Sequence, residues 1–151
     1  MPRIAVVSFR IRFLPCYDLF MLDRADIYLT KAQESLTGAE SELTNGRYNN
    51  SANRAYYACY QAAVAALLGE GMQPSGDRWT HEVVPGLFDG VLINRRKLYA
   101  SDLRGALDRH HILRLRADYG IQLVNEVEMT RMLRRTRAFV AAVQVRRGGS
   151  R

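Results

Sequence analysis

Residues 51–68 read SANRAYYACYQAAVAALL, and this stretch decides the fold. Its apolar residues recur every three or four positions, the spacing that places side chains on one face of an α-helix. That face consists of Ala52, Ala55, Tyr56, Cys59, Ala62, Ala63, Ala66 and Leu67. Alanine side chains are small enough to let a neighbouring helix approach closely. The stretch therefore predicts a helix that packs tightly against another.

Upstream of this stretch, residues 22–43 repeat the same helical spacing. Asn45-Gly46 follows, and such residues supply the left-handed conformation that ends many helices. The central helix is then expected to begin within residues 49–51 (NNS), where any of the three side chains can accept hydrogen bonds from the first free amides. Gly69 ends it. Two helices joined by a short turn are therefore predicted.

Three further helices are predicted downstream. Thr80 caps a shorter one that has Pro85 in its first turns. Ser101 caps a fourth, which ends at Gly120, and a fifth begins around Asn125. Long amphipathic helices joined by short connections are typical of an antiparallel bundle. We therefore expect an all-α bundle of four to five helices, formed by one domain over residues 21–145.

Residues 1–20 have a different pattern. Residues 9–13 (FRIRF) alternate apolar and basic side chains as a short strand does, but no later segment is expected to pair with them. We therefore expect a poorly structured or short-strand leader. Met21 could also be the true start of the chain, in which case the leader is an error of gene annotation.

Composition excludes several protein classes. The chain has 151 residues, 48% apolar and 25% charged, which is typical of one soluble globular domain. Cys16 and Cys59 belong to no Cys/His array, so neither a disulfide framework nor a zinc site is expected. No apolar run approaches the roughly 18 residues of a membrane helix. We expect a cytoplasmic protein without metal or cofactor.

The positive charge is concentrated at one end. Acidic and basic side chains balance over residues 1–130, so the whole net charge of +7 lies in residues 131–151, which end in a basic tail over 146–151. Such a segment attracts phosphate backbones or an acidic partner. It is equally typical of a solvated helix face with a frayed end, and the sequence leaves both interpretations open.

Residues 104–119 (RGALDRHHILRLRADY) hold the densest run of groups suited to acid–base or phosphate chemistry. On one helix, a polar line would flank the buried stripe; it consists of Arg104, Asp108, His111 and Asp118. His110 points toward the stripe instead. We expect His110 to be a hydrogen-bonded core residue.

Tyrosines form a second cluster. Bases can stack on Tyr56, Tyr57 or Tyr60 while Arg54 contacts a phosphate, although aromatic residues at helical spacing are also typical of a core. Tyr57 is the one whose hydroxyl we expect at the surface. His81, next to Thr80, is expected to belong to a helix cap.

Several blocks taken together resemble the HEPN family, the small helical partners of minimal nucleotidyltransferases. They are residues 53–58 (NRAYYA), 80–84 (THEVV) with Phe88, 113–120 (LRLRADYG) and Phe139-Val140. The resemblance covers about residues 22–145. It implies a homodimer of four- or five-helix subunits, and many such proteins act as metal-independent ribonucleases in toxin–antitoxin pairs.

The family hallmark is an arginine followed, after four to six residues, by a histidine. Arg104 with His110 or His111 meets this spacing, and only His111 shares the expected helix face with Arg104. Gln61 stands where many close relatives have the histidine after Arg54. The resemblance thus implies catalytic roles for Arg104, His111, Arg114 and Asp118, and nucleic-acid contacts for Arg54, Tyr57, Arg116 and Tyr119.

Three functions fit this sequence. The first is a HEPN-type toxin or toxin-like RNA-binding protein, including a metal-independent endoribonuclease, that is paired with a nucleotidyltransferase antitoxin. The second is a non-catalytic helical module that docks a nucleotidyltransferase. Gln61 favours this function, because an amide side chain can form hydrogen bonds but cannot take up and release a proton. The third is a nucleic-acid binder that uses the C-terminal arginines.

Overall fold

The computed structural model describes residues 16–149, and side chains from Arg24 onward. This part of the chain is helical and contains no strand, which confirms the all-α prediction. The elements are α1 (Cys16–Thr44), α2 (Tyr48–Gly69), α3 (Val83–Leu87), the π-helix η1 (Phe88–Arg95), the 3₁₀-helix η2 (Ser101–Leu103), α4 (Ala106–Tyr119) and α5 (Glu126–Gly149).

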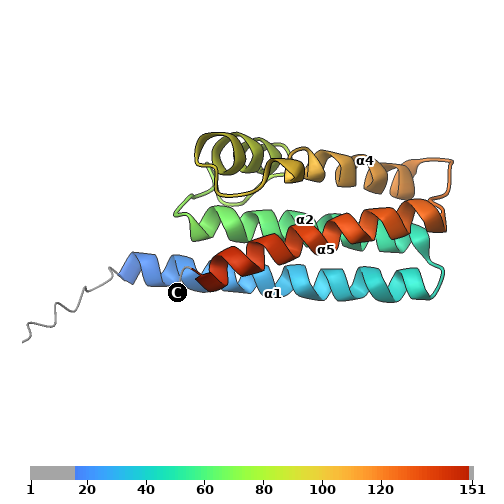
Figure 1. Ribbon diagram of the computed structural model, residues 1–151, viewed down its shortest axis with the longest axis horizontal. Helices are drawn as coiled ribbons and strands as arrows, with labels where there is room; N and C mark the ends of the chain where they lie inside the picture. Colours follow the sequence, from blue (N-terminus) through green and yellow to red (C-terminus); the bar gives the residue numbers. More distant parts are fainter. Residues whose placement is uncertain (1–15, 150–151) are drawn as a thin grey trace, which may run out of the picture.

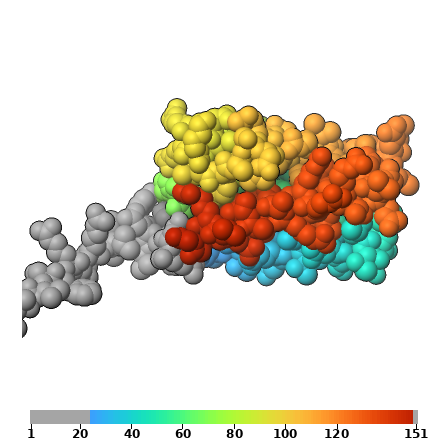
Figure 2. Space-filling view, in the orientation of Figure 1, coloured from blue at the N-terminus to red at the C-terminus, as the bar shows by residue number. Residues whose placement is uncertain are grey.

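The helix α2 lies at the centre of the bundle. It contacts α1, α4 and α5, and α1 also contacts α5 (Figure 1). The helix α4 lies on the side of α2 away from α1, while α5 crosses the front of the molecule in this view (Figures 1 and 2). The predicted helical bundle is therefore confirmed, and α2 positions the other long helices.

Small residues line the contact between α1 and α2. Ala25, Ala32 and Ala39 are completely buried on α1, and the predicted apolar face of α2 is buried along its whole length. Side chains of this size let the two helices approach closely along their length. The dense alanines of residues 51–68 are thus explained as a close helix–helix contact.

The turn between α1 and α2 agrees with the prediction at the end of α1 but not at the start of α2. Gly46 has a φ of 73°, so the left-handed cap after α1 is confirmed. However, α2 begins at Tyr48 without a side-chain cap. The Asn49 Oδ1 atom instead accepts the Val124 N–H at 3.0 Å, and the Ser51 hydroxyl donates to the Ala39 carbonyl at 2.7 Å. These side chains bind other elements, so the predicted cap is wrong.

The predicted third and fourth helices also differ from the structure. The predicted third helix begins at Val83, and it continues without a break from the five-residue α3 into the π-helix η1. Ser101 begins the short η2, and α4 starts at Ala106 after Gly105, whose φ is 68°. The Asp89 carboxylate accepts the Gly105 N–H at 2.8 Å. Contact with η1 therefore sets the start of α4.

The end of α4 and the start of α5 match the prediction. Gly120 follows α4 directly. Before α5, the Asn125 Oδ1 atom accepts the Glu128 N–H at 2.9 Å, and the Glu128 carboxylate accepts the Asn125 N–H at 3.4 Å. This reciprocal pair is a capping box, so the predicted start of α5 is confirmed.

Both chain ends differ from the expected boundaries. Residues 16–20 of the expected leader are the first residues of α1, while the strand expected over residues 9–13 lies outside the described part. Residues 146–149 of the expected basic tail continue α5. Arg146 pairs with Glu70 at 3.0 Å and Arg147 pairs with Asp26 at 2.5 Å. Part of the C-terminal charge is thus neutralised within the fold.

Candidate functional site

Two histidines and an arginine gather where the α2–α3 connection meets α4. We call His81, His111 and Arg114 the histidine–arginine cluster. The imidazole rings of His81 and His111 face each other at an angle of 29° between their planes, with centroids 6.2 Å apart. His81 precedes α3, whereas His111 and Arg114 lie one turn apart on α4. Residues distant in sequence therefore bring two imidazoles and a guanidinium to one place.

Tyrosine rings of α2 form the floor beneath this cluster. The Tyr56 ring centroid lies 5.1 Å from that of His111, and the Tyr60 centroid lies 4.6 Å from that of His81. The guanidinium carbon of Arg114 lies 5.6 Å from the ring centroids of both Tyr56 and Tyr57. A cation at this distance from an aromatic ring is attracted by its electrons. The rings therefore hold Arg114 in place.

Helix geometry explains why α4 presents these groups together. His111, Arg114 and Asp118 are three and four residues apart, so they share one face of α4. The Arg114 Nε atom donates to Asp118 at 3.0 Å, and the Asn53 amide on α2 donates to the same carboxylate at 3.1 Å. Asp118 thus fixes Arg114 and ties α4 to α2.

The structure places His81 differently from the sequence prediction. It does not cap α3, because Glu82 is the N-cap residue and no side chain caps that helix. The His81 Nδ1 atom instead forms a hydrogen bond with the Tyr56 hydroxyl. The sequence missed His81 as a site residue because its partners Tyr60, Tyr56 and His111 lie 21, 25 and 30 residues away along the chain. The available signal was its position in the THEVV block.

Burial and charge set the protonation of the groups around His81. Burial lowers the pKa of His81, and the nearby Arg114 and His111 lower it further. Burial raises the pKa of Tyr56 well above its usual range, and raises that of Tyr60 to about 12. Near pH 7, His81 is therefore mostly uncharged and both tyrosines keep their protons.

Arg104 lies outside this cluster. Gly105 and the start of α4 at Ala106 take it off the helix, and its guanidinium donates to the Asn94 side chain at 2.7 Å. The expectation that Arg104 and His111 share one helix face is therefore wrong. The physical reason is the left-handed Gly105, which redirects the chain immediately before α4.

Comparisons with known proteins decide the family. The HEPN domain family matches residues 25–146, which is most of the chain. The chain belongs to the HEPN domain family. It is also 34% identical over 101 residues to a UPF0332 protein of Archaeoglobus fulgidus, a match that covers 66% of this chain and 75% of that protein.

The residues expected to contact nucleic acid lie in several parts of this HEPN domain. Tyr57 adjoins the histidine–arginine cluster and is partly exposed. Arg54 runs beside α1, where a Cβ on Gly38 would lie 3.7 Å from its side chain. Arg116 donates to Glu128 of α5 at 2.7 Å, and Tyr119 is 77% exposed. Of these four, only Tyr57 contacts the cluster.

Gln61 has a structural role in this HEPN domain. Its amide group faces three acceptors, with nitrogen distances of 2.8 Å to the Ser35 hydroxyl, 2.9 Å to the Lys31 carbonyl and 3.2 Å to the Tyr57 carbonyl. It therefore joins α2 to α1. A proton-carrying group at this position would not be aimed at His81 and His111.

His110 is a core residue, as predicted. It is 1% exposed, its Nδ1 atom lies 2.7 Å from the Ala106 carbonyl, and its Nε2 atom lies 2.8 Å from the Thr136 hydroxyl. Burial lowers its pKa to about 4. His110 is therefore a neutral link between α4 and α5, and it is separate from the site.

An apolar stripe runs along α4 beside the cluster. Ile112, Leu115 and Tyr119 are 67%, 39% and 77% exposed, and their spacing of three and four residues places them on one face. We call these three residues the α4 stripe. Apolar surface gathered in this way commonly marks a contact with another protein.

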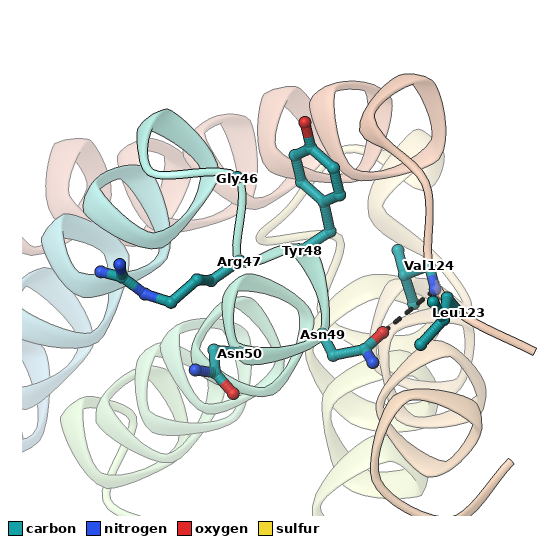
Figure 3. Close-up of a pocket in the computed structure, with 7 residues that line it drawn as sticks. All are labelled: Gly46, Arg47, Tyr48, Asn49, Asn50, Leu123 and Val124. Atoms are coloured by element: carbon teal, nitrogen blue, oxygen red, sulfur yellow. Dashed lines mark hydrogen bonds between the residues drawn. The ribbon is translucent and has the colours of Figure 1, made fainter.

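A separate pocket lies at the turn between α1 and α2 (Figure 3). Its volume is about 210 Å³, and it is lined by Gly46, Arg47, Tyr48, Asn49, Asn50, Leu123 and Val124. It contains no histidine and none of the predicted site residues. The Asn49 side-chain oxygen accepts the Val124 N–H, so the lining of this pocket attaches the α4–α5 connection to the start of α2. The pocket is separate from the histidine–arginine cluster.

The described residues contain neither a metal-binding group of side chains nor a helix that could span a membrane. No group of three or more histidine, cysteine, aspartate or glutamate side chains is placed to hold a metal ion there. Within the same part of the chain, no helix is long and apolar enough to span a membrane. The histidine–arginine cluster is therefore the strongest candidate site that the described residues offer.

Proposed function

We propose that this HEPN domain binds single-stranded RNA at the histidine–arginine cluster and cleaves it without a metal ion. The observation that carries the proposal is the position of His81, His111 and Arg114 over the tyrosine floor. An imidazole can move a proton near neutral pH, and a guanidinium can hold a phosphate. These are the groups that transfer of a phosphoryl group to a neighbouring hydroxyl requires.

The proposed reaction uses the hydroxyl that RNA carries and DNA lacks. An imidazole removes the proton of the ribose 2′-hydroxyl, and the oxygen attacks the adjacent phosphorus while the bond to the next nucleotide breaks. Arg114 neutralises the charge that builds on the phosphate oxygens, and Asp118 holds the guanidinium in position. Tyr57 offers a ring on which a neighbouring base can stack.

The proposal includes a pair of subunits and an antitoxin, both of which follow from the family resemblance. The α4 stripe adjoins the cluster on the same helix, so a second copy of the chain docked there would bring two clusters near each other. We propose a cytoplasmic homodimer that acts as a toxin and is restrained by a minimal nucleotidyltransferase antitoxin.

The first test compares substrates rather than variants. Purified protein is incubated in EDTA with end-labelled single-stranded RNA and with DNA of the same sequence. We expect the RNA to be cut, leaving a 2′,3′-cyclic phosphate and a 5′-hydroxyl, while the DNA stays intact. Replacing one ribose with deoxyribose at a mapped cleavage site should protect that site. Cleavage of this modified RNA at the same bond would contradict the proposed chemistry.

The alternative function is a non-catalytic module that docks a nucleotidyltransferase. The α4 stripe favours it, because three exposed apolar side chains on one helix suit a protein partner. RNA that is bound but never cut, together with a stable complex with a nucleotidyltransferase, would favour this alternative. The third function loses support because Arg137, Arg146 and Arg147 pair with acidic groups of the fold.

Substitution of the α4 stripe tests the proposed pair of subunits. An Ile112→Lys protein is expected to sediment as a single subunit where the native protein sediments as a pair, because the lysine would bring an unpaired charge into the contact. The matched control is Val145→Lys, which alters an apolar residue on α5 that is 76% exposed, compared with 67% for Ile112. A pair that survives in Ile112→Lys would show that the subunits meet elsewhere.

A further inference from the structure

We propose that His81 is the residue that accepts the ribose proton and that His111 serves as a fixed N–H donor to the phosphate. This inference rests on the proposed RNA cleavage and assigns distinct roles to the two imidazoles. It differs from the sequence-based expectation, in which His111 carries the catalytic role and His81 belongs to a helix cap.

The contact at Nδ1 of His81 suits a group that gains and loses a proton. The Tyr56 hydroxyl bonds this nitrogen, and a hydroxyl can either donate to a bare nitrogen or accept from an N–H. When Tyr56 accepts the Nδ1–H of the ring, Nε2 is left bare and can take up a proton. Within the described residues, the Nε2 atom of His81 makes no hydrogen bond, and the residue is exposed, so this nitrogen is free to meet substrate.

The corresponding nitrogen of His111 has a different environment. Its Nδ1 atom is buried and has no hydrogen-bond partner. A proton on this nitrogen would be a buried donor without an acceptor, which is unfavourable. The ring is therefore held in the form that carries its proton on Nε2. Such a ring offers one N–H donor, at Nε2.

The surroundings of His81 keep it ready to accept a proton near neutral pH. The titratable or charged groups that face it are Tyr56, Tyr57 and Tyr60 on α2, His111 and Arg114 on α4, and the adjacent Glu82. Burial lowers the pKa of His81, and Arg114 and His111 act in the same direction, while Glu82 opposes them. The ring is thus mostly uncharged at pH 7.

The proposed step can be written with every proton accounted for. The 2′-hydroxyl proton moves to the bare Nε2 of His81, while the Nδ1–H of the same ring donates to the Tyr56 oxygen before and after the transfer. The 2′-oxygen bonds to phosphorus, and the bond from phosphorus to the 5′-oxygen breaks. That oxygen takes a proton from water, and the resulting hydroxide takes the proton from His81. The products are a 2′,3′-cyclic phosphate and a 5′-hydroxyl.

The test measures cleavage rate against pH for three proteins. In the native protein, the rate should rise with pH through the pKa of His81, which lies below 6.5, and then level off. His81→Gln should lose at least about 100-fold in rate and lose this rising limb. His111→Gln keeps an N–H donor, so it should retain the limb and lose no more than about tenfold in rate. Circular dichroism and RNA affinity establish that each variant is folded.

Rescue with free imidazole separates proton transfer from structural effects. Added imidazole should restore part of the rate of His81→Ala, because it can occupy the space left by the ring and accept the proton. It should leave Arg114→Ala unchanged. A limb that persists in His81→Gln but disappears in His111→Gln would overturn this assignment while leaving RNA cleavage standing. Native protein that cuts no RNA would overturn both.

Discussion

An Arg114→Ala protein should cleave RNA about 100- to 1,000-fold more slowly than the native protein, since this is the usual effect of removing one group that stabilises developing charge. The guanidinium lies over the Tyr56 and Tyr57 rings and is fixed by Asp118. The guanidinium is therefore already held beside the histidines before a phosphate binds. Single-turnover cleavage of labelled RNA in EDTA measures the loss.

Two further variants make this result specific. Arg114→Lys keeps the charge but loses the planar group that can hold two phosphate oxygens, so it should recover only part of the rate. Arg134→Ala removes an exposed arginine of α5 and should behave as the native protein. Equal losses in Arg114→Ala and Arg134→Ala would indicate a general effect of positive charge and would contradict a site at the cluster.

We also expect the folded protein to lose stability at acidic pH because His110 is buried in its uncharged form. Its pKa is about 4 in the folded protein, because the ring is buried between Ala106 and Thr136, and about 6.5 in an unfolded chain. Between these values the unfolded chain binds a proton that the folded protein does not. The free energy of unfolding therefore decreases as the pH is lowered, by about 2 kcal/mol between pH 7 and pH 5.

Urea unfolding at several pH values, followed by circular dichroism, measures this loss. His110→Gln has no imidazole to titrate, so its free energy of unfolding should change with pH by about 2 kcal/mol less over the same range. His81→Gln is the matched control, because His81 is exposed and shifted in the same direction to a smaller degree. The shifted carboxylates, such as Asp89, remain in both variants and cancel in the comparison. Parallel pH curves for the native protein and His110→Gln would refute the role of His110.

The helices could be predicted closely because their signals are local. The spacing of apolar residues predicted the long helices, and Gly46 and Gly120 marked two of the helix ends correctly. The cap proposed at residues 49–51 failed because Asn49 binds the Val124 amide far along the chain, and such contacts override local preference. Ser101 begins only a short 3₁₀-helix, and α4 starts at Ala106.

The candidate site was only partly predictable. His111, Arg114 and Asp118 lie on one stretch of α4, so helical spacing alone placed them together. Arg104 was assigned to the same line wrongly, because nothing local showed that Gly105 would adopt a left-handed conformation bonded to Asp89. His81 was overlooked because its partners, Tyr56 and His111, are 25 and 30 residues away.

The sequence alone determined that this chain forms a helical bundle of the HEPN family with a chemically rich α4. The bundle was predictable because helical periodicity depends on neighbours within a few positions, whereas the family was recognised by the resemblance of its motif blocks. Only the tertiary structure showed that His81 joins His111 and Arg114, that Arg104 lies elsewhere, and that Gln61 faces α1. Packing between elements decides which side chains meet, and that packing depends on the whole chain.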